Sequence, residues 1–179
     1  ADALRLDSVL FLPAQTPPHK TGRAISPIAH RLAMVELAIA GDARFALSTM
    51  DLRAGTPSYT ADLVEQVAAQ YPGSDLYFIA GADSLRDFPT WHEPERIIRT
   101  AFLAIAGRPG IEITESMLAA LPDLRQRTAI FESPLMAISS SDLRTRVRTG
   151  KSIRYVVPEP VERYIAEHGL YRDGAFPSD

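Results

Sequence analysis

The sequence contains no cysteine among its 179 residues. This absence excludes thiol catalysis, thiolate zinc sites and a disulfide framework, and it fits a reducing compartment, so we expect a cytoplasmic protein. A broad excess of positive charge is also missing, because the net charge is -3 at pH 7 and the pI is near 5.8. No apolar run approaches the roughly 20 residues that span a bilayer, and no signal peptide pattern is present. We therefore expect neither a nucleic acid nor a membrane as a partner.

Several motifs of common enzymes are missing as well. The sequence has no Walker loop, no Gly-x-Gly-x-x-Gly fingerprint and no Gly-x-Ser-x-Gly elbow, which disfavours P-loop hydrolysis, classical dinucleotide redox chemistry and serine hydrolysis. The four histidines do not have the spacing of a metal site, so we expect no metal held by the protein itself. The chemistry that remains is the handling of nucleotides by helix ends.

Short apolar segments alternate with helical patterns along the chain. Residues 8–12, 44–48, 76–80, 102–106 and 128–131 have the length and character of strands. A helix is expected from Pro27, with Ser26 as its N-cap, to the residue before Gly41, and another from Thr60 to the residue before Pro72. Further helical patterns cover residues 82–87, 94–100, 114–121, 140–149 and 158–168.

This alternation indicates an α/β fold, a doubly wound Rossmann-like parallel sheet with helices on both faces. Segment 8–12 is expected to be a central strand, buried on both faces. Residues 1–171 are expected to form a single domain, and residues 172–179 a loose tail. Residues 1–6 have the pattern of the last turns of an amphipathic helix, so we expect the chain to begin inside the domain.

Polar residues follow the predicted strands, at the edge where ligands bind in open α/β sheets. His19 and Lys20 end a proline-rich loop and suit a phosphate, or form a solvated surface pair. Gly81 and Asp83 form a small-residue turn, in which the carboxylate either contacts a ribose hydroxyl or caps a helix. Arg108 lies in a tight turn, as a phosphate clamp or as a plain surface arginine.

The turn after the fifth strand carries the richest set of phosphate-binding groups. Ser139 and Ser141 lie at a predicted helix start, with Arg144 in the first turn. Free N–H groups, hydroxyls and a guanidinium together suit a polyphosphate. Ser139 with Asp142 also fits a capping box, and the two roles are compatible, whereas Arg144 also fits a basic helix face.

Two residues suit a ring-bearing substrate. Trp91, the only tryptophan, either stacks on a heteroaromatic ring or packs in the core. Thr60 opens a helix after a hydroxyl-rich stretch, where it either helps to hold a carboxylate or serves as part of a routine cap.

Taken in order, these stretches resemble the bacterial nicotinate-mononucleotide adenylyltransferases of the nucleotidyltransferase α/β phosphodiesterase superfamily. The resemblance covers nearly the whole chain and rests on the order of its motifs. They are Phe11-Leu12-Pro13-Ala14, Pro17-Pro18-His19-Lys20, Ser58-Tyr59-Thr60, Gly81-Ala82-Asp83, Trp91, Arg108-Pro109-Gly110, Ile138-Ser139-Ser140-Ser141 with Arg144, and the ending from Gly150 to Tyr171.

The resemblance implies a reaction and a set of roles. Nicotinate mononucleotide would attack the α-phosphorus of ATP in the presence of Mg²⁺, giving the dinucleotide and pyrophosphate. The mononucleotide would be bound by a group in which Thr60 and Trp91 contact the ring: His19, Lys20, Thr60, Trp91 and Arg108. ATP would be bound by a second group, in which Asp83 contacts ribose: Gly81, Asp83, Ser139, Ser141 and Arg144.

The family's first strand ends in a Gly-x-Phe-Asp-Pro-x-His-x-Gly-His motif, and this sequence does not contain it. We therefore expect the catalytic histidines upstream of Ala1 and assign no catalytic residue within the chain. Two alternatives stay open: transfer to nicotinamide mononucleotide or another phosphate ester, and nucleotide binding without catalysis. Assembly into a homo-oligomer is compatible with both.

Overall fold

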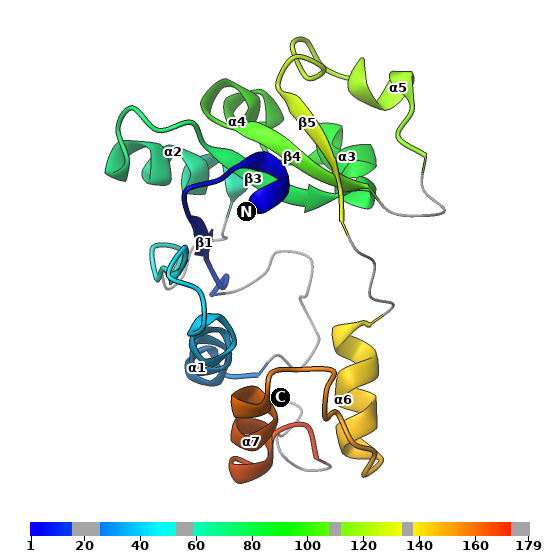
Figure 1. The fold of residues 1–179 in the computed structure, drawn as a ribbon. Helices are drawn as coiled ribbons and strands as arrows, with labels where there is room; N and C mark the ends of the chain where they lie inside the picture. Colours follow the sequence, from blue (N-terminus) through cyan, green and yellow to red (C-terminus); the bar gives the residue numbers. More distant parts are fainter. Residues whose placement is uncertain (16–25, 53–58, 108–111, 134–137, 173–179) are drawn as a thin grey trace. The chain divides into compact units, whose positions relative to one another are not determined.

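The computed structural model describes residues 1–15, 26–52, 59–107, 112–133 and 138–172 (Figure 1). The chain divides into two compact units. Unit 1 consists of Ala1 and residues 6–54 and 136–179, whereas unit 2 consists of residues 2–5 and 55–135. Each unit has its own parallel strands and its own apolar core.

Unit 2 is built on a three-stranded parallel sheet. Its strands are β3 (Tyr77–Gly81), β4 (Phe102–Gly107) and β5 (Thr128–Glu132), in the order β3-β4-β5. Their register places Ile105 of β4 beside Ala80 on one side and Ile130 on the other. Because parallel neighbours need long connections, helices occupy the segments between these strands.

The helices of unit 2 begin where the local sequence favours a start. They are α2 (Thr60–Gln70), α3 (Ala82–Asp87), α4 (Pro94–Thr100) and α5 (Glu115–Leu118), with 3-10 turns η1 (Asp2–Leu4) and η3 (Phe88–Thr90). Proline at the first position suits α4, since its missing N–H would have no partner there. Thr114 caps α5 by accepting a hydrogen bond from the N–H of Met117.

An ion-pair network joins α2 to α4. The guanidinium of Arg96 lies 2.9 Å from Asp62 and 2.6 Å from Glu65, and it also pairs with Glu93. Hydrogen bonding to Arg96 lowers the pKa of Glu65, and bonding to Glu65, Glu93 and Asp62 raises the pKa of Arg96. The core of unit 2 contains six large apolar side chains with at most 1% of their residue surface exposed: Leu85, Phe88, Ile97, Leu103, Ile105 and Leu124.

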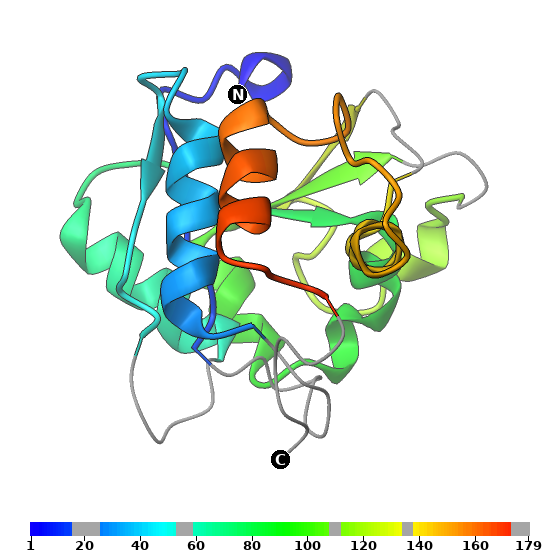
Figure 2. The ribbon, with the colours of Figure 1, turned by 90° about the horizontal axis from the view of Figure 1, so that it is seen from below.

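The described residues of unit 1 form a two-stranded parallel sheet and three α-helices. The strands are β1 (Val9–Phe11) and β2 (Phe45–Leu47), and the helices are α1 (Ile28–Ile39), α6 (Ser140–Arg148) and α7 (Glu159–Glu167). Figure 2 shows α1 and α7 side by side, in agreement with their contacts. Their shared core consists of four buried residues, Ile153, Val161, Ile165 and Leu170, with flanking side chains from α1, α6 and α7.

The α/β class with parallel strands and flanking helices is confirmed, and each strand and helix predicted after residue 7 is present, whereas residues 1–6 contain only the 3-10 turn η1. Three local expectations are wrong. Segment 8–12 is not a central, fully buried strand, because β1 is partly exposed and pairs only with β2 among the described residues. Pro27, not Ser26, holds the N-cap position of α1, and α5 ends at Leu118 instead of residue 121. The tail expected at 172–179 lies outside the described residues, except for Arg172.

Candidate functional site

The carboxyl end of β3 runs directly into α3. Gly81 ends the strand and holds the N-cap position, so Asp83 lies in the first helical turn and does not occupy the cap. The Asp83 carboxylate is about half exposed and lies 3.9 Å from the guanidinium of Arg86. A Cβ atom added to Gly81 would meet no described heavy atom within 4 Å. This end of the strand therefore presents an open backbone and a carboxylate to solvent.

Trp91 and Thr60 lie in unit 2 on different elements. The Trp91 ring packs edge-on to Phe78 at 5.7 Å and at a tilt to Phe88 at 5.4 Å, measured between ring centroids. The packing role is thus confirmed, and the half-buried side chain still retains some exposed surface. Thr60 begins α2, directly after Tyr59 at the N-cap position.

One aromatic pair near these residues was missed by the sequence analysis. The ring of Tyr59 stacks on the ring of His92, with centroids 4.0 Å apart and an angle of 29° between the planes. Tyr59 directly precedes Thr60, and His92 directly follows Trp91. Thr60 and Trp91 are the residues that the resemblance assigns to the mononucleotide ring. The pair joins those two stretches, although they are about thirty residues apart in the sequence.

The start of α6 in unit 1 combines a helix N-terminus with hydroxyl and guanidinium groups. Ser139 Oγ accepts a 3.0 Å hydrogen bond from the N–H of Asp142, which confirms the predicted cap. Arg144 donates a 3.1 Å hydrogen bond to Ser141 Oγ, so one hydroxyl caps the helix and the other lies beside the guanidinium. The side chains of Ser139, Ser141 and Arg144 are exposed. A helix dipole and a cation at one exposed point suit an anion.

A residue that the sequence analysis did not single out binds the described residues directly after β1 and directly before α1. Arg31 of α1 donates hydrogen bonds to the backbone oxygens of Ser26, Ala14 and Gln15, at 3.1, 2.7 and 3.1 Å. Burial lowers the pKa of this guanidinium, an effect that nearby Tyr171 opposes. The one feature of the sequence that could have indicated this role is an arginine among the apolar residues of α1. Its partners could not be predicted, because backbone oxygens leave no pattern in a sequence.

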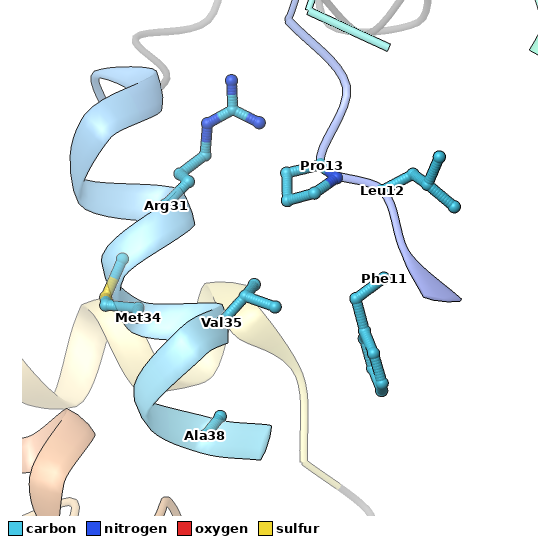
Figure 3. A pocket seen from close by; sticks show the side chains of 7 residues that line it. All are labelled: Phe11, Leu12, Pro13, Arg31, Met34, Val35 and Ala38. Atoms are coloured by element: carbon cyan, nitrogen blue, oxygen red, sulfur yellow. The ribbon is translucent and has the colours of Figure 1, made fainter. Parts of the chain in front are cut away.

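A pocket of about 430 Å³ lies between the end of β1 and α1 (Figure 3). It is lined by apolar side chains from both elements and by one cation: Phe11, Leu12, Pro13, Arg31, Met34, Val35 and Ala38. Three other predicted site residues, His19, Lys20 and Arg108, lie outside the described residues.

The predicted ATP-binding residues are divided between the two units. Gly81 and Asp83 belong to unit 2, whereas Ser139, Ser141 and Arg144 belong to unit 1. Within unit 1 the structure brings Ser141 and Arg144 into contact. In the described parts of the chain, no three histidine, aspartate or glutamate side chains are grouped closely enough to hold a metal ion. None of the described helices has the length and apolar character to cross a membrane.

Comparisons with known proteins agree on one family. The cytidylyltransferase-like family pattern matches residues 1–146. A probable nicotinate-nucleotide adenylyltransferase of Thermomicrobium roseum is 51% identical over 172 residues, which cover 96% of this chain and 80% of that protein. Another, of Symbiobacterium thermophilum, is 42% identical over 172 residues, which cover 94% of this chain and 83% of that protein.

A solved structure shares the fold. It is the Plasmodium falciparum nicotinic acid mononucleotide adenylyltransferase complexed with NaAD, with a TM-score of 0.71 and 20% identity, and the match covers 93% of this chain and 83% of that one. At this identity the likeness concerns the fold alone, and the sequence relatives carry the assignment. The chain belongs to the nicotinate-nucleotide adenylyltransferases, a family of nucleotidyltransferases.

Proposed function

We propose that this protein transfers the adenylyl group of ATP to nicotinate mononucleotide, producing nicotinate adenine dinucleotide and pyrophosphate in NAD biosynthesis. The observation that carries the proposal is the 51% identity to a probable nicotinate-nucleotide adenylyltransferase over 96% of the chain. The helix start at Ser139, with its exposed hydroxyl and guanidinium groups, supports it independently of the relatives.

The reaction exchanges one phosphate bond for another. An oxygen of the mononucleotide phosphate forms a bond to the α-phosphorus of ATP, and the bond from that phosphorus to the oxygen bridging to the β-phosphate breaks. The electron pair leaves with pyrophosphate. The protein needs no covalent intermediate in this reaction, so its contribution is the alignment of two substrates and the neutralisation of their charge.

Ser139, Ser141 and Arg144 are the proposed ligands of the ATP phosphates. The backbone N–H groups at the start of α6 and the Arg144 guanidinium both favour negative charge at the same exposed place. Gly81 and Asp83 are proposed for the adenosine part, where the open backbone at Gly81 permits close approach and the carboxylate accepts from ribose hydroxyls.

Thr60 and Trp91 are the proposed contacts of the nicotinate ring, and His19, Lys20 and Arg108 of the mononucleotide phosphate. The exposed part of the Trp91 indole and the Thr60 position at the start of α2 support the first group. The second group rests on the family resemblance.

Mg²⁺ is proposed to enter with ATP as an ion bound to its phosphates. Such an ion keeps several waters and needs few protein ligands. It therefore does not require a group of three acidic or histidine side chains, and the described residues contain no such group. A cytoplasmic location fits a reaction that consumes ATP, and the proposal is compatible with a homo-oligomer.

The test is dinucleotide formation by the full-length protein, as its gene encodes it, from ATP and nicotinate mononucleotide. Chromatography would follow the dinucleotide and a coupled assay the pyrophosphate, with nicotinamide mononucleotide as the competing acceptor. Dinucleotide and pyrophosphate are expected in equal amounts. The kcat/KM is expected to be higher for nicotinate mononucleotide than for nicotinamide mononucleotide. A protein that forms no dinucleotide from nicotinate mononucleotide, and none from nicotinamide mononucleotide, would overturn the proposal.

A pair of variants tests the phosphate site. Arg144→Met is expected to raise the KM for ATP by about 10-fold or more, the loss of one charge-assisted contact. Arg148→Met, one turn further along the same helix, is the matched control, because it removes the same charge away from the helix start. Equal effects of the two would indicate a general basic face without a specific site.

A further inference from the structure

A closed circuit of side-chain contacts joins the start of α2 to the turn before α4 in unit 2. Tyr59, at the N-cap position of α2, stacks on His92, and the Nε2 atom of His92 lies 3.1 Å from Oε2 of Glu93. The same Glu93 oxygen pairs with Arg96, whose guanidinium also lies 2.9 Å from Asp62 in the first turn of α2. The circuit thus returns to the helix start at which it begins.

Glu93 has a backbone conformation that glutamate rarely adopts. It holds the N-cap position of α4 in the left-handed region, with φ 48° and ψ 56°. A side chain makes this region unfavourable, so a residue remains there only when its surroundings fix it. The contacts of the Glu93 carboxylate with His92 and Arg96 supply that constraint. Backbone outliers of this kind are concentrated where a binding surface has to keep one geometry.

Arg96 connects the two helices. Its Nε and one terminal nitrogen bind the two oxygens of Glu65 at 2.9 and 2.6 Å, and the same terminal nitrogen binds Asp62. The other terminal nitrogen binds Glu93. A guanidinium can serve these carboxylates together because it presents several donors in a rigid planar fork. Only 26% of the Arg96 side chain is exposed, so solvent screens these pairs less than it screens pairs on an open surface.

Thr60 and Trp91 directly adjoin the stacked rings of this circuit, one on each side of it. We propose that Glu93 and Arg96 are positioning residues for nicotinate mononucleotide: they hold the turn that carries Trp91 at a fixed distance from the start of α2, where Thr60 lies. The inference rests on the proposed function, in which Thr60 and Trp91 contact the nicotinate ring. A ring bound by two elements needs both in place, because a small displacement of one weakens binding strongly.

The first experiment measures the turn without reference to the reaction. In Arg96→Met and Glu93→Gln, amide hydrogen exchange across residues 91–100 is expected to be about 10-fold faster than in the wild type, because the turn and the start of α4 open more often. Mass spectrometry of peptic fragments of the full-length protein would follow the exchange. Arg125→Met is the matched control, since it removes an exposed arginine that pairs with Glu115 in the same unit.

The second experiment measures what the circuit does for the reaction. Both variants are expected to show a KM for nicotinate mononucleotide raised by about 10-fold, with the KM for ATP within about 2-fold of wild type. The double variant is expected to resemble either single variant, because Glu93 and Arg96 act in one circuit. Thermal melts identify the variants that remain folded, and Glu93→Gln serves if Arg96→Met does not fold.

Faster exchange together with a selective rise in the mononucleotide KM would support the proposal. Unchanged exchange in folded variants would show that the circuit does not hold the turn. Faster exchange with unchanged KM values, or with equal rises for both substrates, would overturn the role in positioning the mononucleotide. A wild-type protein that makes no dinucleotide would overturn the proposed function instead, and the exchange rates would still decide whether Glu93 and Arg96 hold the turn.

Discussion

The Nδ1 atom of His30 lies 2.9 Å from the hydroxyl oxygen of Tyr164, which joins the first turn of α1 to α7. The Tyr164 ring also stacks on the imidazole of His168, with centroids 3.9 Å apart. Both contacts lie beside the core of Ile153, Val161, Ile165 and Leu170. The hydrogen bond thus reinforces the packing of α1 on α7, and the stacked pair lies within α7 and its C-cap.

Tyr164→Phe removes only the hydroxyl of this arrangement. It is expected to lower the free energy of unfolding by about 1 kcal/mol, the usual net value of a partly buried hydrogen bond. Urea denaturation would measure the change. Tyr155→Phe is the control, because the Tyr155 side chain is 92% exposed. Equal stabilities for Tyr164→Phe and the wild type would contradict a stabilising role for the bond.

Gly81→Ala separates binding from folding. The backbone of Gly81 has φ -88° and ψ 167°, which any residue adopts, and an added Cβ meets no described atom within 4 Å. We expect a stability within about 0.5 kcal/mol of wild type and a raised KM for ATP, because the methyl group would occupy the space proposed for the adenosine part. A stable variant with an unchanged KM would remove Gly81 from the proposed site.

The two serines of α6 are expected to respond differently to alanine. Ser139→Ala loses the cap bond to Asp142 and should cost about 1 kcal/mol of stability. Ser141→Ala keeps the cap and should mainly raise the KM for ATP. Thermal melts and initial rates on both variants make the comparison. A large stability loss in Ser141→Ala would show that its hydroxyl supports the fold.

The single tryptophan makes substrate binding visible by fluorescence. If the nicotinate ring stacks on the exposed part of Trp91, titration with nicotinate mononucleotide should quench the emission in a saturable way. Trp91→Phe should raise the KM for the mononucleotide and retain most of the packing against Phe78 and Phe88. Emission that does not change at saturating substrate would leave Trp91 with its packing role alone.

Acid should remove the contribution of the Asp42–Arg44 pair over a defined range. Hydrogen bonding from Arg44 lowers the pKa of Asp42 to about 2, below the ordinary value of about 3.9. A lowered folded-state pKa means that the pair's contribution is complete above the ordinary pKa and is lost as pH falls through about 2. Asp42→Asn and Arg44→Gln should each flatten the dependence of stability on pH between about 4 and 2, and the double variant should add little more.

Most helices and strands could be predicted from the sequence because each depends on local chemistry. The prediction failed where contacts with residues distant in the sequence determine the local structure. Ser139 caps α6 as expected, since its hydroxyl needs only the N–H three residues later. Ser26 was predicted to cap α1 in the same way. Proline fits both the N-cap and the first helical position, however, and Pro27 takes the N-cap position with an extended ψ of 141°. The Ser26 carbonyl is instead bound by Arg31.

The candidate site shows the same division. The residues around Ser139 could be predicted because hydroxyls at a helix start have a recognisable spacing. The hydrogen bonds of Arg31 could not, because its acceptors at Ala14 and Gln15 are backbone atoms 17 and 16 residues away. The stacking of Tyr59 on His92 likewise depends on how α2 packs on α4, because Tyr59 directly precedes α2 and His92 lies two residues before α4.

The central position of β4 has a consequence for how this protein can tolerate change. Leu103 and Ile105 are buried on one face of the strand, and β4 is paired on both sides, with β3 and β5. Deleting a single residue within Phe102–Gly107 would turn every later side chain of the strand to the opposite face and misalign two ladders at once. Length variation among natural or engineered versions of this chain should therefore collect in the connections, while the six positions of β4 keep their number.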